Sequence, residues 1–170
     1  MFCHCEFTIA QLNTFSKVYP FVNQASIFLD VAELNGKYYS SGVVVMPNSI
    51  ERGYLVGNNE IGNLLFTSLK EGNDSTSPTI VLTGILSLDS NLYISGQHWI
   101  YDSTLLKYAL DPILLKYDTL GNQLWFRKDY GFGSRNFATS KDFIYHNNQI
   151  LTLGSTIYEA TTGQSRTQNT

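Results

Sequence analysis

The chain repeats one short pattern three times, and this repeat constrains the fold more than any other feature. Residues 36–42 read Gly-Lys-Tyr-Tyr-Ser-Ser-Gly, residues 90–96 read Ser-Asn-Leu-Tyr-Ile-Ser-Gly, and residues 148–154 read Asn-Gln-Ile-Leu-Thr-Leu-Gly. The closing glycines of the three copies lie 54 and then 58 residues apart. Self-similarity at a fixed period is the sequence signature of proteins built from stacked supersecondary units.

The composition indicates that each unit is made of strands. The chain holds 11 Tyr, 10 Phe and 13 Gly, and only 15% of its residues are charged. Aromatic and β-branched residues between Gly and Asn turns suit a pleated, half-buried surface. The best helical pattern, at 103–110, is barely two turns long and ends before Asp111-Pro112, so we expect a decorated loop there.

We therefore predict an all-β fold of β-propeller-type four-stranded blades, incomplete at about two and a half blades. In the second unit the expected strands cover 79–88, 92–100, 113–117 and 123–128. A long loop at 101–111 precedes the third of these strands. The expected parts are, in chain order, a fourth-type strand at 14–19, a blade at 25–69, a blade at 79–129 and a half blade at 136–158, all within 11–160.

The register of the repeat makes a sharper prediction. Tyr38, Leu92 and Ile150 should occupy one equivalent buried strand position. The three closing glycines should occupy one equivalent backbone position. The half blade should leave an unpaired strand edge at its end, because the expected remainder, 161–170, is a polar truncated tail.

The N-terminal segment 1–10 is open to two interpretations. It is the remnant of a signal peptide, or the start of a first strand at 7–12. It contains Cys3, His4 and Cys5, which are too few and too closely spaced for a closed zinc site. We expect no metal and no cofactor.

Charge and hydropathy exclude two classes of partner. The net charge is −3 with a pI near 5.5, and the 11 basic residues are scattered, so no nucleic-acid surface is expected. No apolar run approaches the roughly 20 residues that span a bilayer, so no membrane span is expected.

One stretch resembles a known family. Residues 111–125 read Asp-Pro-Ile-Leu-Leu-Lys-Tyr-Asp-Thr-Leu-Gly-Asn-Gln-Leu-Trp, and Tyr130-Gly131 follow. This is similar to the repeat of bacterial secreted seven-bladed β-propeller proteins, of the kind found on Bacteroidetes-type cell surfaces. The resemblance implies a secreted or cell-surface location and downstream blades of the same polypeptide. It departs in the first unit, where Arg52 and residues 57–59 replace the motif, and it supplies no catalytic residues.

Few residues offer chemistry. His98 could form an acid–base pair with Asp102 or Asp111, but no nucleophile lies beside it in the sequence. We therefore assign no catalytic residue. Residues outside the repeat pattern are the better ligand candidates, since variable insertions on repeat folds tend to carry binding. The candidate ligand-binding residues are His98, Trp99, Tyr101 and Tyr108.

The function expected from these features is non-catalytic. We expect an exported propeller module that binds a glycan or a surface protein, or acts as a scaffold. The alternative is part of a propeller-based extracellular polysaccharide hydrolase or lyase, with His98 and Asp102 on its loop face. The sequence leaves the ligand, the total number of blades and the true N-terminus open.

Overall fold

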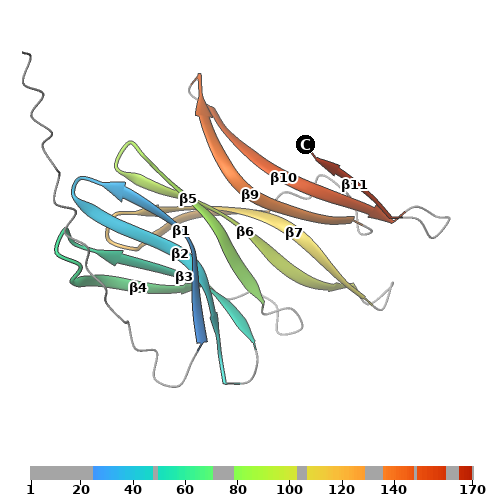
Figure 1. Ribbon diagram of the computed structural model, residues 1–170, viewed down its shortest axis with the longest axis horizontal. Coiled ribbons are helices and arrows are strands. Elements are labelled where there is room, and N and C mark those ends of the chain that lie inside the picture. The colour runs from blue at the N-terminus through green and yellow to red at the C-terminus, as the bar shows by residue number, and fades with distance from the viewer. Residues whose placement is uncertain are drawn as a thin grey trace, which may run out of the picture.

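The protein is all-β, and its strands run in antiparallel meanders (Figure 1). The computed structural model describes residues 25–47, 50–70, 79–102, 107–128, 136–147, 149–159 and 165–169. The expected strand at 14–19 and the segment 1–10 lie outside these residues. The strands are β1 (Ala25–Leu34), β2 (Lys37–Val45), β3 (Glu51–Asn58), β4 (Leu64–Lys70), β5 (Ile80–Leu88), β6 (Asn91–Asp102), β7 (Lys107–Asp118), β8 (Gln123–Lys128), β9 (Asn136–His146), β10 (Gln149–Glu159) and β11 (Ser165–Asn169).

Two four-stranded meanders are complete. Strands β1 to β4 form one sheet in chain order, which we call unit 1. Strands β5 to β8 pair in the same order and form unit 2. The hairpin β9–β10 is unit 3, and it joins the sheet of unit 2 through one parallel pairing of β9 with β7. Neither sheet closes on itself among the described strands.

The repeat glycines occupy the same backbone position in all three units, as predicted. Each opening hairpin has a two-residue loop and then a bulge on its first strand. The bulge always follows the pairs Gly42↔Phe28, Gly96↔Leu82 or Gly154↔Ser140. A Cβ on Gly42 or Gly96 would collide with the carbonyl oxygen of the bulged strand, so only glycine fits there.

The turns between the third and fourth strands are also copies of one another. Gly62 and Gly121 both have positive φ, at 77° and 88°. The N–H of Gly62 donates to the carbonyl of Asn59 at 2.9 Å, and the N–H of Gly121 donates to the carbonyl of Asp118 at 3.2 Å. The side chains of Asn59 and Asp118 each accept backbone N–H groups within their turn. Equivalent residues of the two turns are therefore 59 positions apart in the sequence.

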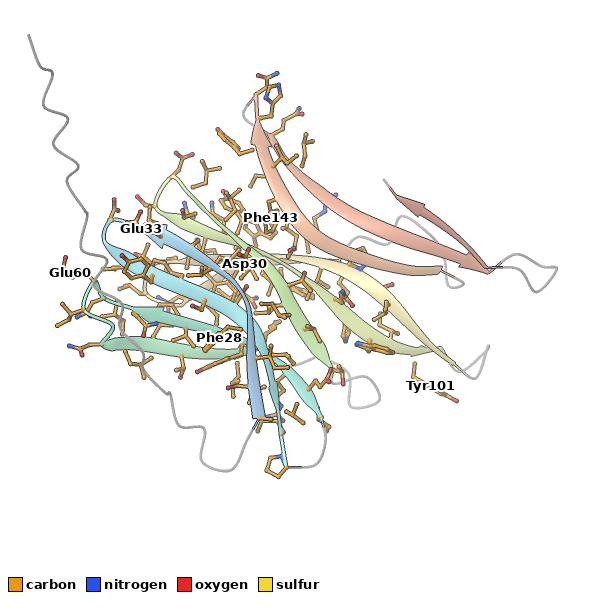
Figure 2. All side chains as sticks on the ribbon, viewed as in Figure 1. Phe28, Asp30, Glu33, Glu60, Tyr101 and Phe143 are labelled. Atoms are coloured by element: carbon orange, nitrogen blue, oxygen red, sulfur yellow. The ribbon has the colours of Figure 1, made fainter. Side chains whose placement is uncertain are left out.

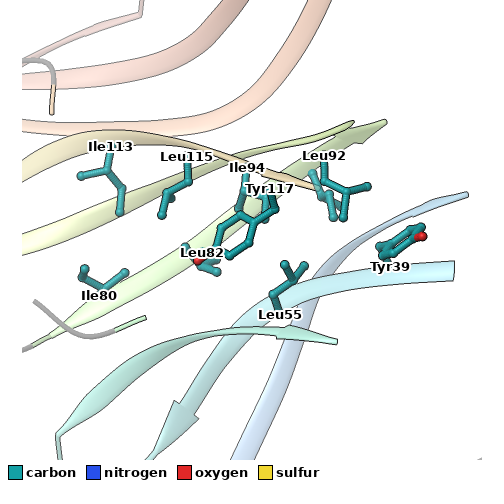
Figure 3. Packing of buried hydrophobic residues seen from close by; sticks show 10 residues of the cluster. Tyr39, Leu55, Ile80, Leu82, Leu92, Ile94, Ile113, Leu115 and Tyr117 are labelled. Atoms are coloured by element: carbon teal, nitrogen blue, oxygen red, sulfur yellow. The ribbon is translucent and has the colours of Figure 1, made fainter. Parts of the chain in front are cut away.

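The units stack head to tail. Strand β5 lies against β1, β2 and β3, and strand β9 lies against the corresponding β5, β6 and β7. The face of unit 1 that carries Tyr39 packs on the face of unit 2 that carries Leu92 (Figure 3). In the aligned hairpins Tyr39 is equivalent to Tyr93, and Tyr38 is equivalent to Leu92. Because the Tyr39 face packs on the Leu92 face, the contact joins opposite faces of the two units. We call the Tyr39 side of each unit its front face and the Tyr38 side its back face.

The core lies between these two sheets. It is formed by side chains that are at most 6% exposed, and removing them from water is the main force that holds the units together. The partly buried Ala32, Leu34, Phe66 and Phe126 pack against it. The buried core members are Tyr39, Leu55, Ile80, Leu82, Ile85, Leu92, Ile94, Ile113, Leu115 and Tyr117.

Three expectations need correction. Tyr38 is 36% exposed and Ile150 is half-buried, whereas Leu92 is fully buried because unit 1 packs on the back face of unit 2. The polar C-terminal segment contains a strand, β11, and this strand pairs with β10 from Ser155 to Glu159, so the prediction of an unpaired edge is wrong for this part of β10. The expected loop at 101–111 is mostly strand.

Candidate functional site

The hairpin β6–β7 is longer than its counterpart in unit 1. The pairing of β2 with β3 ends at Val45↔Glu51, which corresponds to Trp99↔Leu110. Beyond that point β6 and β7 continue for three more pairs, ending at Asp102↔Lys107. We call residues 100–102 and 107–109 the arm. Both strands continue here, where a loop was expected, so the arm is a regular extension of the sheet of unit 2.

The arm concentrates aromatic side chains. Tyr101 stands directly opposite Tyr108 in the register, and Trp99 lies two residues before Tyr101. Side chains two residues apart on a strand share a face, about 7 Å apart along the strand. Tyr101 is 36% exposed and lies at the outer end of the hairpin (Figure 2), and Trp99 is half-buried. The side chain of Tyr108 lies outside the described residues.

His98 lies away from this surface. It is 1% exposed, and it points from β6 to the back face, between units 1 and 2. Its counterpart in unit 1 is the buried Val44, so unit 2 carries an imidazole where unit 1 carries an isopropyl group. Of the two acid partners considered for it, the structure places Asp111 directly opposite His98, and Asp102 four residues further out.

Two lysines complete a polar cluster with His98 and Asp111. Lys128 ends β8 beside Ile113, and Lys70 ends β4 beside Gly53. Gly53 faces Ile80 and Leu82 of unit 2, so Lys70 lies at the interface between the units. Lys128 is close enough to Lys70 and to Asp111 to shift the pKa of each. The ammonium of Lys70 lies 4.7 Å from the ring centroid of Phe126.

The cluster shifts the acidity of its members. Burial raises the pKa of the Asp111 carboxyl, and the nearby Lys128 and His98 oppose that shift only in part. Burial lowers the pKa of the Lys70 ammonium, and the positive charge of Lys128 lowers it further. A carboxyl with a raised pKa beside an imidazole has the chemistry of a proton donor. His98 itself is buried, whereas Asp111 is half-buried.

The aromatic pairs of the front faces repeat as well. Tyr39 and Phe66 have ring centroids 6.2 Å apart in unit 1, and their counterparts Tyr93 and Trp125 are also 6.2 Å apart in unit 2. Phe66 is covered by the turn of the next unit, since a Cβ on Gly121 would overlap its ring. Trp125 is 37% exposed. The ammonium of Lys116 lies 5.2 Å from the Tyr93 ring centroid on the same face.

The described residues contain no group of three or more His, Cys, Asp or Glu that could hold a metal ion. Cys3, His4 and Cys5 lie outside these residues. The part of the chain that the structure describes has no helix long and apolar enough to cross a bilayer.

The sequence singled out the arm but missed the polar cluster. Lys70 and Lys128 carry no motif and lie 58 residues apart. They come close to each other only because unit 1 stacks on unit 2. The offset of 59 residues between the turns, applied to β4 and β8, is the sequence signal that could have placed the two lysines at the same end of the stacked sheets. Compared with known proteins, the sequence matches no family model and no curated protein.

Proposed function

We propose that the chain is a non-catalytic, exported module of β-propeller-type blades that binds a glycan through the aromatic arm. The single observation that carries the proposal is the arm itself, an extension that unit 1 lacks and that places Tyr101 on the same strand face as Trp99 at its base. Flat aromatic faces suit the C–H faces of sugar rings, and tyrosine adds a hydroxyl for polar contacts. The head-to-tail stacking of the units supports the propeller, and the resemblance at 111–125 supports the secreted location.

A glycan-array screen of the full chain, followed by titration calorimetry on the best ligand, tests the proposal. Tyr101→Ala and Trp99→Ala should each weaken binding by at least tenfold. Tyr145→Ala is the matched control, since Tyr145 is 42% exposed at the far hairpin of unit 3 and should leave the affinity unchanged. Equal losses at Tyr101 and Tyr145, or no glycan ligand at all, would contradict the proposal. Capture of a protein that requires Tyr101 would point to protein recognition instead.

A second candidate function is hydrolysis or elimination on an extracellular polysaccharide. The observation that favours it is the cross-strand pair of His98 and Asp111, in which burial raises the pKa of the carboxyl. Turnover assays on pooled polysaccharides distinguish the two functions. An enzyme should lose its activity with Asp111→Asn, and a binding module should show no turnover in either protein.

A further inference from the structure

Two lysines from different units come together where unit 1 packs on unit 2. Lys70 is the last residue of β4 and Lys128 is the last residue of β8, and both are half-buried. Lys70 stands opposite Gly53 on the front face of unit 1. Lys128 stands opposite Ile113 on the back face of unit 2, at one end of the core (Figure 3). Since these two faces pack on each other, the lysines approach the same edge of the core from opposite sides.

The ring of Phe126 brings the Lys70 ammonium beside the strand that carries Lys128. The Nζ atom of Lys70 lies 4.7 Å from the centroid of this ring. Phe126 precedes Lys128 by two residues on β8, so their side chains share a face and lie about 7 Å apart along the strand. Phe126 also packs against the core. The two positive charges therefore lie at the edge of an apolar surface, where water screens them less than in bulk solvent.

The charges around the two lysines do not balance. Burial lowers the pKa of Lys70, and the positive charge of Lys128 lowers it further. Glu51 shares the front face of β3 with Gly53, two residues away, but the charge that acts on Lys70 is that of Lys128. Asp111 lies near Lys128, and burial raises the pKa of this carboxyl, so its negative charge is disfavoured. Two neighbouring ammonium groups thus face one carboxyl whose ionisation is penalised, and the cluster lacks negative charge.

We infer that Lys70 and Lys128 together bind one oxyanion, a carboxylate, sulfate or phosphate group, through hydrogen bonds from both ammonium groups. The oxyanion accepts charge-assisted hydrogen bonds and removes the repulsion between the two positive charges. Because one lysine belongs to each unit, the bound anion also stabilises the packing of unit 1 on unit 2. The site lies on the back face of unit 2, whereas Trp99 and Tyr101 lie on its front face, so it is separate from the proposed glycan site.

The test titrates the full chain, labelled with ¹³C at its lysines, with sodium acetate, sulfate and phosphate at constant ionic strength. In proton–carbon NMR spectra the Cε signals of Lys70 and Lys128 should shift together and saturate with one dissociation constant. Saturation with acetate alone identifies a carboxylate site, and saturation with sulfate or phosphate alone identifies a site for tetrahedral oxyanions. Lys70→Met and Lys128→Met should each weaken binding about tenfold, because each removes one charge-assisted hydrogen bond.

Arg127→Met is the matched control, because it removes a positive charge from the opposite face of the same strand and should leave the affinity unchanged. The Cε signal of Lys116, on the front face of unit 2, should not follow the binding curve. Absence of saturation in the unmodified chain, or an equal loss with Arg127→Met, would overturn the inference, and the first result requires no variant to fold. Tyr101→Ala should bind the anion normally, so this inference and the glycan proposal can fail independently.

Discussion

The carboxylate of Asp30 accepts a hydrogen bond from the backbone N–H of Ile85 at 2.8 Å, across the interface between the two sheets. Its other oxygen accepts the N–H of Val31, also at 2.8 Å. Both N–H groups follow a β-bulge, one in β1 and one in β5. A bulge disrupts the ladder locally, so the N–H groups beside it need other acceptors. One carboxylate thus serves the bulges of two consecutive units and helps to set how they stack (Figure 2).

The first prediction concerns this link. Asp30→Ala should lower the free energy of unfolding by about 1–3 kcal/mol, because the N–H of Ile85 loses its acceptor in a partly buried place. Asp30→Asn keeps one acceptor oxygen and should lose less. Urea unfolding measures both, and amide exchange at Ile85 should speed up in the alanine variant. Unchanged exchange at Ile85 would show that the bond contributes little.

The second prediction separates backbone strain from crowding at Gly121. Gly36 and Gly121 both have positive φ, at 73° and 88°. A Cβ on Gly36 would meet only the Glu60 carboxylate at 3.8 Å, whereas a Cβ on Gly121 would overlap the ring of Phe66. Gly36→Ala should therefore show only the backbone cost, about 1–2 kcal/mol, and Gly121→Ala should be more destabilising. Combining Gly121→Ala with Phe66→Ala should reveal strong coupling between the two sites in chemical denaturation, and simple additivity would contradict the contact.

The third prediction concerns the repeat glycine. Gly96→Ala would place a methyl group against the carbonyl oxygen of Val81, 2.5 Å from it. Backbone cannot yield as a flexible side chain does, so the substitution should destabilise unit 2 strongly. Ser87→Ala is a comparison on the same hairpin, which loses only the 2.8 Å bond from its hydroxyl to the carbonyl of Glu33. Thermal melts of the two variants should differ clearly, and similar midpoints would refute the packing argument.

The fourth prediction is a pH dependence. Burial raises the pKa of Asp111 above its ordinary value of 3.8, so the native state binds the proton more tightly than the unfolded state. The contribution of this carboxyl to stability is therefore most favourable below pH 3.8, and it falls as the pH rises through the native pKa. Asp111→Asn does not titrate. Its stability relative to the unmodified chain should rise between pH 3 and pH 7, as measured by urea unfolding at each pH. A difference that does not change with pH would show that the carboxyl titrates normally.

Local features of this fold were predictable from the sequence because short-range chemistry determines them. The turn at 118–122 follows from an Asp that bonds its own backbone and a glycine with positive φ. The hairpin register follows from the repeat glycines. Both are settled within a few residues, so one unit could be aligned on another before its neighbours were known.

Burial could not be read from the repeat in the same way. Tyr38 and Leu92 occupy the same hairpin position, yet one is exposed and the other is buried. Which face of a unit is covered depends on its neighbours in the stack, and the pattern within the unit does not contain that information. The proximity of Lys70 to Lys128 also depends on how the units stack, so it could not be predicted from the sequence of either unit.

The arm was misassigned because of Pro112. A proline in a strand removes a ladder donor and usually marks its end. Here β7 pairs with β8 only from Ile113 onwards, so Pro112 stands where that neighbour is missing. It pairs with Gln97 of β6, and the strand runs through it.

The alternation of front and back faces has a consequence for how such a protein can change over generations. Every unit offers the next one the same pair of surfaces, so duplicating or deleting a unit-sized piece of the gene creates no new kind of contact. The number of units in the chain can then change without any change in the residues that pack between units. Novelty gathers at the ends of hairpins, and the extension that carries Tyr101 beyond the register of unit 1 is an example.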